Sequence, residues 1–170
     1  MVLVNGIAAL FKHQKVIIMI MKSDLEIKKG VEHELRWDTG IEHPDIKVKV
    51  KNGQVTLTGT VNAYPLKVEA ERASLRVNGV IWVNNNIEVR IENKRTDSEI
   101  EKAVINAIRW NTSIKDDEIR VQVTDGWVTL EGEVEYEYQK TKARNLTEDI
   151  SGVVGITNLI HVMSEFVTKR

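Results

Sequence analysis

Residues 53–61 read Gly-Gln-Val-Thr-Leu-Thr-Gly-Thr-Val, and residues 126–134 read Gly-Trp-Val-Thr-Leu-Glu-Gly-Glu-Val. The two stretches stand 73 residues apart, and the same offset relates residues on both sides of them, such as Asp24 with Asp97 and Asn85 with Asn158. Agreement at one fixed offset over a whole module indicates an internal duplication. We therefore predict two tandem copies, residues 23–90 and 96–163, joined by a charged linker at residues 91–95.

Strand and turn signals occupy the middle of each copy. Ile46, Val48 and Val50 alternate with lysines, which is typical of a strand that is buried on one face. Asn52-Gly53 and Asp125-Gly126 favour a two-residue hairpin turn, because such a turn needs positive φ at both positions. Each copy therefore contains a predicted hairpin at its centre.

Helical signals flank the hairpin in both copies. Ser23 and Thr96 are predicted N-caps of the first helices, and apolar residues follow them at helical spacing. A second helix and a third strand follow the hairpin, so each copy reads α-β-β-α-β. We predict an α+β fold with two helices on one face of each three-stranded sheet. Asn85 and Asn158 fall on the buried side of the last strands, where we expect their amides to bond the backbone.

The amino-acid composition argues against several classes of function. The 170 residues include 24 basic and 25 acidic side chains, so bulk charge does not favour nucleic acid as a partner. Cysteine is absent, which excludes disulfides and thiolate metal sites. No stretch approaches the roughly 18 apolar residues of a membrane-spanning helix.

The ends of the chain lie outside the two copies. Residues 1–22 are interpreted as an N-terminal extension that need not be ordered, and residues 164–170 as a C-terminal tail. The apolar run at residues 16–21 is shorter than the core of a secretory signal, and Met21 is the expected natural start. A weak export signal or a membrane-touching arm is the alternative for this segment.

Both copies resemble the BON domain, a family named for bacterial osmotically induced and nodulation proteins. The resemblance is carried by the Asn-Gly or Asp-Gly turn, the Val-Thr-Leu-x-Gly-x-Val strand, the Gly-Val pair and the Val-x-Asn-x-Ile-x-Val last strand, and it covers residues 21–163. It implies a non-catalytic, stress-associated bacterial module that binds phospholipid surfaces or envelope proteins, and it implies no catalytic residues or cofactor. The expected compartment is the cytoplasm, with the periplasm as the alternative.

An enzyme is not favoured by the residues themselves. His13, His33, His43 and His161 show no metal-ligand spacing, so no metal site is predicted from them. The acidic run at residues 116–118 lacks the frame of a calcium-binding loop and is read as a solvated loop.

Three lysines form the first candidate site. Lys47, Lys49 and Lys51 share one face of the first strand, where they could attract anionic lipid headgroups. Alternatively, they protect an edge strand from pairing with another sheet. The second copy has Arg120, Gln122 and Thr124 at these positions, so the lysine stripe is not a property of the module.

Tryptophans form the second candidate site. Trp82 and Trp127 are predicted on the sheet face away from the helices, and Leu159 shares that face. These residues would contact protein, through packing of sheets or a homo-oligomer, or would anchor the chain at a membrane interface. Trp37 and Trp110, at the ends of the first helices, are instead expected to cap the core.

Two functions are compatible with these sites. The first is attachment to phospholipid surfaces or envelope proteins through the lysine stripe and the exposed aromatic surface. The alternative is a chaperone-like or structural interaction protein whose sheet faces bind polypeptides or self-associate. Salt should weaken the first kind of binding and have little effect on the second.

Overall fold

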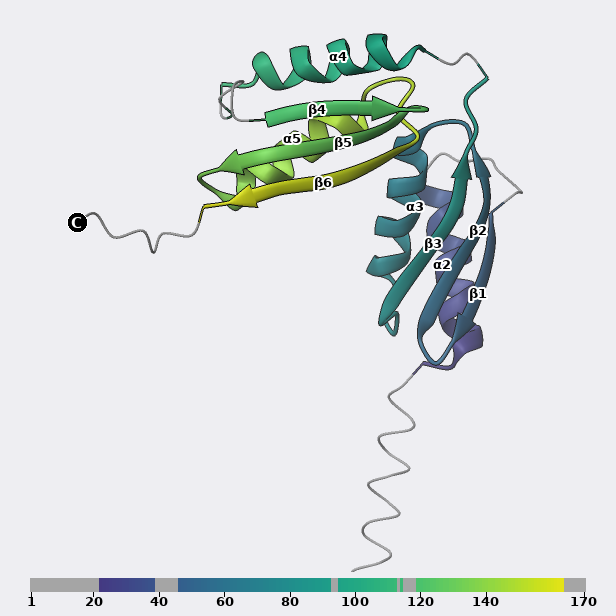
Figure 1. Cartoon of the computed structure of the whole chain (residues 1–170). Helices are drawn as coiled ribbons and strands as arrows, with labels where there is room; N and C mark the ends of the chain where they lie inside the picture. Colours follow the sequence, from purple (N-terminus) through teal and green to yellow (C-terminus); the bar gives the residue numbers. More distant parts are fainter. Residues whose placement is uncertain (1–21, 39–45, 93–94, 113, 115–118, 164–170) are drawn as a thin grey trace, which may run out of the picture. The chain divides into compact units, whose positions relative to one another are not determined.

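The computed structural model describes residues 22–38, 46–92, 95–112, 114 and 119–163. The chain forms two compact units, each built around one three-stranded sheet (Figure 1). The predicted α+β class with two α-β-β-α-β modules is confirmed. Residues 1–21 of the expected extension at residues 1–22, and the tail at residues 164–170, lie outside the described residues.

The first unit contains two helices and three strands. In chain order they are α2 (Asp24–Asp38), β1 (Lys47–Lys51), β2 (Gln54–Val61), α3 (Tyr64–Arg76) and β3 (Trp82–Val89). The strand order is β1-β2-β3, and β1 pairs antiparallel with β2. The Ile81 amide donates to the Gly53 carbonyl at 2.9 Å, and the Arg90 amide to the Val61 carbonyl at 2.8 Å. Because both residue numbers rise together, β3 runs parallel to β2.

The second unit repeats this order. Its elements are α4 (Asp97–Arg109), β4 (Ile119–Thr124), β5 (Trp127–Val134), α5 (Glu137–Glu148) and β6 (Gly155–Val162). β4 pairs antiparallel with β5, and β5 pairs parallel with β6. A parallel pair needs a crossover connection, which α5 supplies.

The hairpin turns have the predicted geometry. Asn52 and Gly53 have φ of 52° and 73°, and Asp125 and Gly126 have φ of 51° and 79°. Positive φ at both central positions is the mark of a type I′ turn, whose twist matches that of the flanking strands. The dipeptides therefore fix where each hairpin reverses.

The predicted N-caps are also confirmed. The Thr96 hydroxyl accepts from the Glu99 amide at 3.3 Å, and the Glu99 carboxylate accepts from the Thr96 amide at 2.9 Å. Ser23 and Glu26 form the same reciprocal pair in the first unit. Bonds from the Thr96 backbone and hydroxyl lower the pKa of Glu99 below its ordinary value. Bonds from the side chain and backbone of Ser23 likewise lower the pKa of Glu26.

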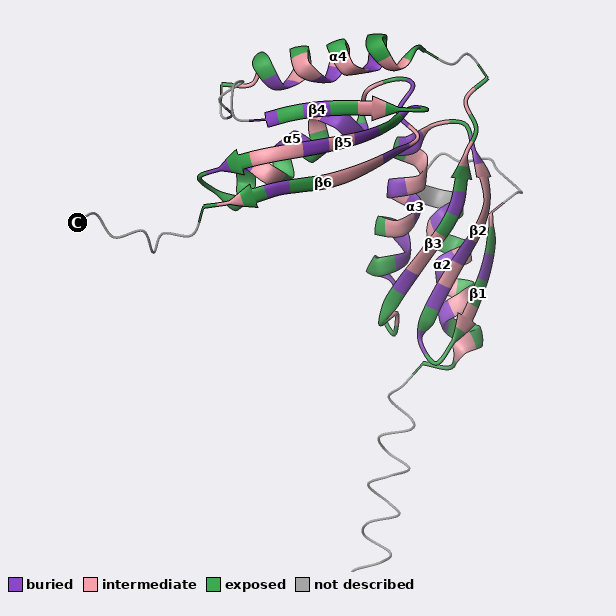
Figure 2. Ribbon diagram, in the orientation of Figure 1, coloured by how far each residue is buried: buried purple, intermediate pink, exposed green. Residues whose placement is uncertain are grey.

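Each core lies between the helices and one face of the sheet. Buried and exposed positions alternate along the strands (Figure 2), as the apolar alternation predicts. The amides of Ile87 and Ile160 donate to the side-chain oxygens of Asn85 and Asn158 at 3.3 Å and 3.2 Å. The expected backbone bonds of both asparagines are therefore confirmed.

The prediction that Trp110 caps the core is wrong. Its side chain is 86% exposed. The buried stripe of α4 consists of Ile100, Val104 and Ile108, and a residue two positions further lies roughly 200° around the helix axis. Trp110 is thus turned away from the core. The side chain of Trp37, its counterpart, lies outside the described part of the structure.

Candidate interaction surface

The face of each sheet that is turned away from the helices carries the predicted site residues. On the first sheet these positions include Lys47, Lys49, Lys51, Gln54, Thr56, Thr58, Trp82, Asn84, Asn86 and Glu88, which are exposed or half-buried. On the second sheet they include Arg120, Gln122, Thr124, Trp127, Thr129, Glu131, Glu133, Thr157, Leu159 and His161, also exposed or half-buried. The two open faces are equivalent in position but differ in charge.

The lysine stripe of Lys47, Lys49 and Lys51 lies on the edge strand β1, and all three side chains are exposed. Their partners on β2 are the uncharged Thr58, Thr56 and Gln54, in that order. Within the described part of the chain, none of the three lysines forms an ion pair. The positive charge of this edge is therefore not neutralised by the sheet that carries it.

The equivalent edge strand of the second unit carries different charges. Its strand β4 carries one cation on the open face, Arg120, which lies directly opposite Glu131 on β5. Opposite charges at paired positions of an antiparallel ladder attract each other. The second edge therefore has a local counter-charge, and the first has none.

A shallow hollow follows the edge strand of the first unit. Lys28, Lys49, Lys51, Gln54 and Thr56 contribute to its lining. Lys28 comes from helix α2 and also contacts Glu32, with 3.7 Å between nitrogen and oxygen. A helix lysine therefore lies next to β1, but its charge is paired with that of Glu32.

The three apolar candidates are exposed on the open faces, as predicted from strand parity. Trp82 is 55% exposed, and Trp127 and Leu159 are each 48% exposed. The Trp127 indole donates to the Thr157 hydroxyl at 2.9 Å, and its ring lies against Gly155, its partner on β6. Trp127 is thus held flat across the sheet.

The two tryptophans occupy one row of the sheet from opposite strands. At an offset of 73 residues, Trp127 corresponds to Gln54 and Gly155 corresponds to Trp82. Each unit therefore places a single indole on this row, paired with glutamine or glycine. Sequence comparison alone did not reveal this exchange, because it appears only when paired strands are known.

A contact between helix start and hairpin turn was missed by sequence reasoning. The Asp24 carboxylate accepts from the amides of Asn52 and Gly53 at 2.8 and 3.0 Å. Asp97 does the same for Asp125 and Gly126 at 2.9 and 2.8 Å. The recurrence of aspartate and turn at the same offset was the available signal.

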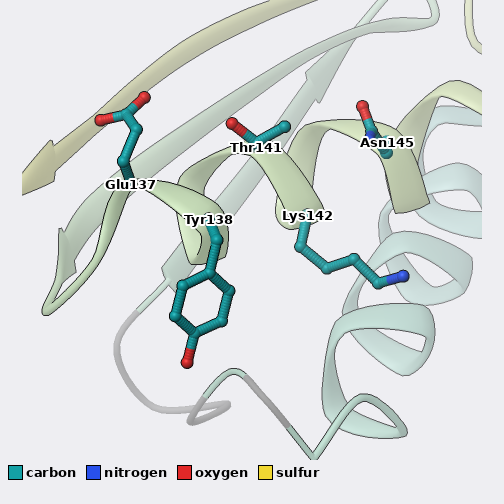
Figure 3. Close-up of a pocket in the computed structure, with 5 residues that line it drawn as sticks. All are labelled: Glu137, Tyr138, Thr141, Lys142 and Asn145. Carbon is teal, nitrogen blue, oxygen red and sulfur yellow. The ribbon is translucent and has the colours of Figure 1, made fainter.

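The exposed side of α5 forms another shallow surface. It is lined by Glu137, Tyr138, Thr141, Lys142 and Asn145, and Tyr138 and Lys142 project from successive turns of the helix (Figure 3). The rings of Tyr136 and Tyr138 stack with centroids 5.6 Å apart. This surface contains no convergent pair of titratable groups within the residues drawn.

Other site classes find no support in the described residues. None of their histidines, aspartates and glutamates gather in a group of three that could hold a metal ion. The acidic run at residues 116–118 lies outside the described ranges. No described helix combines the length and the apolar character needed to cross a bilayer.

The duplicated α-β-β-α-β unit, with its Asx-Gly hairpin and an asparagine in the last strand, defines a class of small α+β modules. Residues 23–91 and 96–164 each match the BON domain, and the chain belongs to the BON domain family. It is similar to osmotically-inducible protein Y of Escherichia coli (strain K12), with 26% identity over 141 residues, which are 79% of this chain and 70% of that protein.

Solved structures of one secretion protein are also similar to this chain. The C-terminal domain of CdsD, the structural protein of the type III secretion system of Chlamydia trachomatis, aligns with a TM-score of 0.36 and 15% identity, over 85% of this chain and 100% of that one. A second CdsD structure aligns with the same TM-score over 82% and 94% of the two chains.

Proposed function

We propose that the protein is a stress-associated, non-catalytic binding protein that attaches to anionic phospholipid surfaces through its first BON domain. Membership of the family and the similarity to an osmotically inducible protein support the association with stress. The lysine stripe of the first unit supports the choice of ligand.

The unneutralised stripe is the observation that carries this proposal. Three exposed lysines at alternate positions of β1 face uncharged partners on β2. A lysine close to an anionic membrane contributes about 1 kcal/mol of attraction. Three lysines that all lie close to the membrane would therefore supply at most about 3 kcal/mol, which is enough to change vesicle binding by roughly a hundredfold.

Protection of an edge strand explains the stripe less well. Lysine on an exposed edge discourages pairing with other sheets. However, the equivalent edge strand β4 has Arg120 with Gln122 and Thr124, and its one cation faces Glu131. One module of this chain thus has an edge without the stripe, so edge protection does not require three lysines.

Co-sedimentation with vesicles tests the proposal. Neutral and anionic vesicles would be compared at low and moderate salt, with the triple variant K47A/K49A/K51A beside the unchanged chain. The matched control is K102A/K140A/K142A, which removes the same charge from the second unit. We expect salt-sensitive binding to anionic vesicles that only the first triple variant loses. Absence of binding to either vesicle would refute lipid attachment.

Binding of polypeptides is the second candidate function. Trp127 and Leu159 lie exposed on neighbouring strands of the second sheet, which favours an apolar contact with protein or with another copy of the chain. Suppression of aggregation of an unfolded client protein would test it. In that case W127A and L159A should reduce the effect at any salt concentration, while the lysine variants should not.

A further inference from the structure

The hairpin end of the first unit carries two adjacent exposed apolar side chains. The hairpin end consists of Lys22, Lys51, Asn52-Gly53, Ile81 and Trp82. Ile81 is 69% exposed and Trp82 is 55% exposed. The bond from the Ile81 amide to the Gly53 carbonyl, at 2.9 Å, fixes this pair beside the turn. Large apolar groups that are exposed at the same end of a small domain mark a contact site.

Basic side chains surround this apolar pair. Lys51 is the last residue of β1, opposite Gln54, and is exposed. Lys22 is exposed as well and lines the same hollow as Ile81. The one carboxylate that lines this hollow, that of Asp24, accepts from the two turn amides. The end therefore combines apolar and cationic groups.

The second unit has only part of this combination: Trp127 lies on the same row as Trp82 and is 48% exposed, and Arg95 stands at the position of Lys22. In place of Ile81 and Trp82 it has Val154, which is half-buried, and Gly155, which lies under the Trp127 ring. In place of Lys51 and Asn52 it has Thr124 and Asp125. The hairpin end of the first unit thus differs from its counterpart by the exposed Ile81 and by a more positive charge, since Lys51 and Asn52 replace Thr124 and Asp125.

We propose that the hairpin end of the first unit is the part that enters an anionic phospholipid bilayer, which rests on the lipid attachment proposed above. Ile81 and Trp82 would lie among the headgroups and upper acyl chains, where tryptophan is favoured. Lys22 and Lys51 would contact lipid phosphates. The first unit would contact the bilayer with its hairpin end, and its sheet would not lie parallel to the membrane surface.

Insertion of the hairpin end and a sheet lying flat on the membrane differ in how much each lysine contributes to vesicle binding. Along a strand, Lys47 lies about 13 Å from Lys51, because each residue advances about 3.3 Å. This exceeds the screening length of about 8 Å at physiological salt. With the hairpin end inserted, K51A should weaken vesicle binding several-fold more than K47A. With the sheet flat on the lipid, the two changes should have equal effects.

Two single-tryptophan chains report which residue enters the bilayer. One chain keeps Trp82 and the other keeps Trp127, with the remaining tryptophans changed to phenylalanine. Both are mixed with phosphatidylglycerol vesicles that contain brominated lipids, and sedimentation is measured on the same samples. We expect Trp82 emission to shift to the blue and to be quenched, and Trp127 emission to be unchanged. Sedimentation without quenching of Trp82 would refute insertion and leave lipid attachment standing, whereas loss of sedimentation by the unchanged chain would refute both.

A matched pair of substitutions keeps the test independent of the tryptophan changes. I81S and V154S alter equivalent positions in chains that are otherwise unchanged. Because Ile81 is largely exposed in the free protein, its replacement should leave the fold intact while weakening vesicle binding about tenfold. V154S should change binding less than twofold. Equal effects of the two substitutions, or of K51A and K47A, would overturn insertion of the hairpin end.

Discussion

Trp127 and Gly155 depend on each other because only one large side chain fits their row of the sheet. The indole lies against Gly155 and bonds Thr157 at 2.9 Å, so a Cβ at residue 155 would collide with the ring. In the first unit the same row holds Gln54 and Trp82, with the large residue on the other strand. The two modules therefore fill the same row with one indole each, from β3 in the first unit and from β5 in the second.

This exchange predicts a non-additive pair of mutations. G155W alone should destabilise the second unit by about 1–3 kcal/mol, because it forces two indoles into one row. Adding W127Q should recover most of this loss, because the double variant reproduces the arrangement of the first unit. Urea unfolding of G155W, W127Q, the double variant and the unchanged chain provides the measurement. Additive effects of the two changes would contradict the shared site.

At the scale of the element, helix α4 begins with a reciprocal cap whose strength depends on pH. The Glu99 carboxylate accepts from both the amide and the hydroxyl of Thr96, at 2.9 and 2.8 Å. These bonds lower the pKa of Glu99, because they favour the charged carboxylate. The stabilisation is fully present above the unfolded pKa of 4.5 and is lost as pH falls through the lower folded pKa.

We predict that the cap no longer stabilises helix α4 once Glu99 is protonated at low pH. Replacing Glu99 with glutamine keeps an acceptor but removes the titration, so the second unit should lose less stability on acidification from pH 5. E101Q, which removes a charge from the same helix outside the cap, should leave this acid-dependent loss in place. T96A should cost about 1 kcal/mol at neutral pH. Thermal unfolding between pH 7 and pH 3 would measure these changes, and identical pH profiles for E99Q and the unchanged chain would count against the cap.

Local patterns predicted most elements, because their causes are local. Asn-Gly and Asp-Gly fix the turns, alternation fixes which strand face is buried, and Ser23 and Thr96 fix the helix starts. The same parity correctly placed Trp82 and Trp127 on the open faces. The functions assigned to those residues and to the lysines stay predictions, since no pattern within a strand reveals what binds to it.

One missed feature depends on packing between distant residues, and the other on the position of a residue around a helix. The sequence pairs Asp24 with Asp97 only as equivalent repeat positions, yet the Asp24 carboxylate accepts from amides 28 and 29 residues further along the chain. Trp110 was placed on the core because it follows a helix, although it lies off the apolar stripe. The Asp24 contact depends on how a helix start meets the hairpin turn, which helical spacing does not specify, whereas the exposure of Trp110 follows from that spacing.

At the scale of the whole molecule, the net charge is −1, but the two modules differ in their own net charge. Residues 24–90 contain ten basic and ten acidic side chains, whereas residues 97–163 contain seven basic and thirteen acidic ones. An anionic surface would repel the second module and admit the first. Duplication followed by divergence has thus produced one domain fitted to the proposed surface and another with a different charge.

A matched pair of core mutations tests whether the first module alone carries binding. Val31 and Val104 occupy equivalent positions, and both are fully buried. Replacing either with alanine should destabilise its own module by about 2 kcal/mol through lost contacts and an added cavity. In a urea concentration that unfolds only the mutated module, V104A should still bind anionic vesicles and V31A should not. Loss of binding in both variants would mean that attachment needs both modules, and loss in V104A alone would place it on the second.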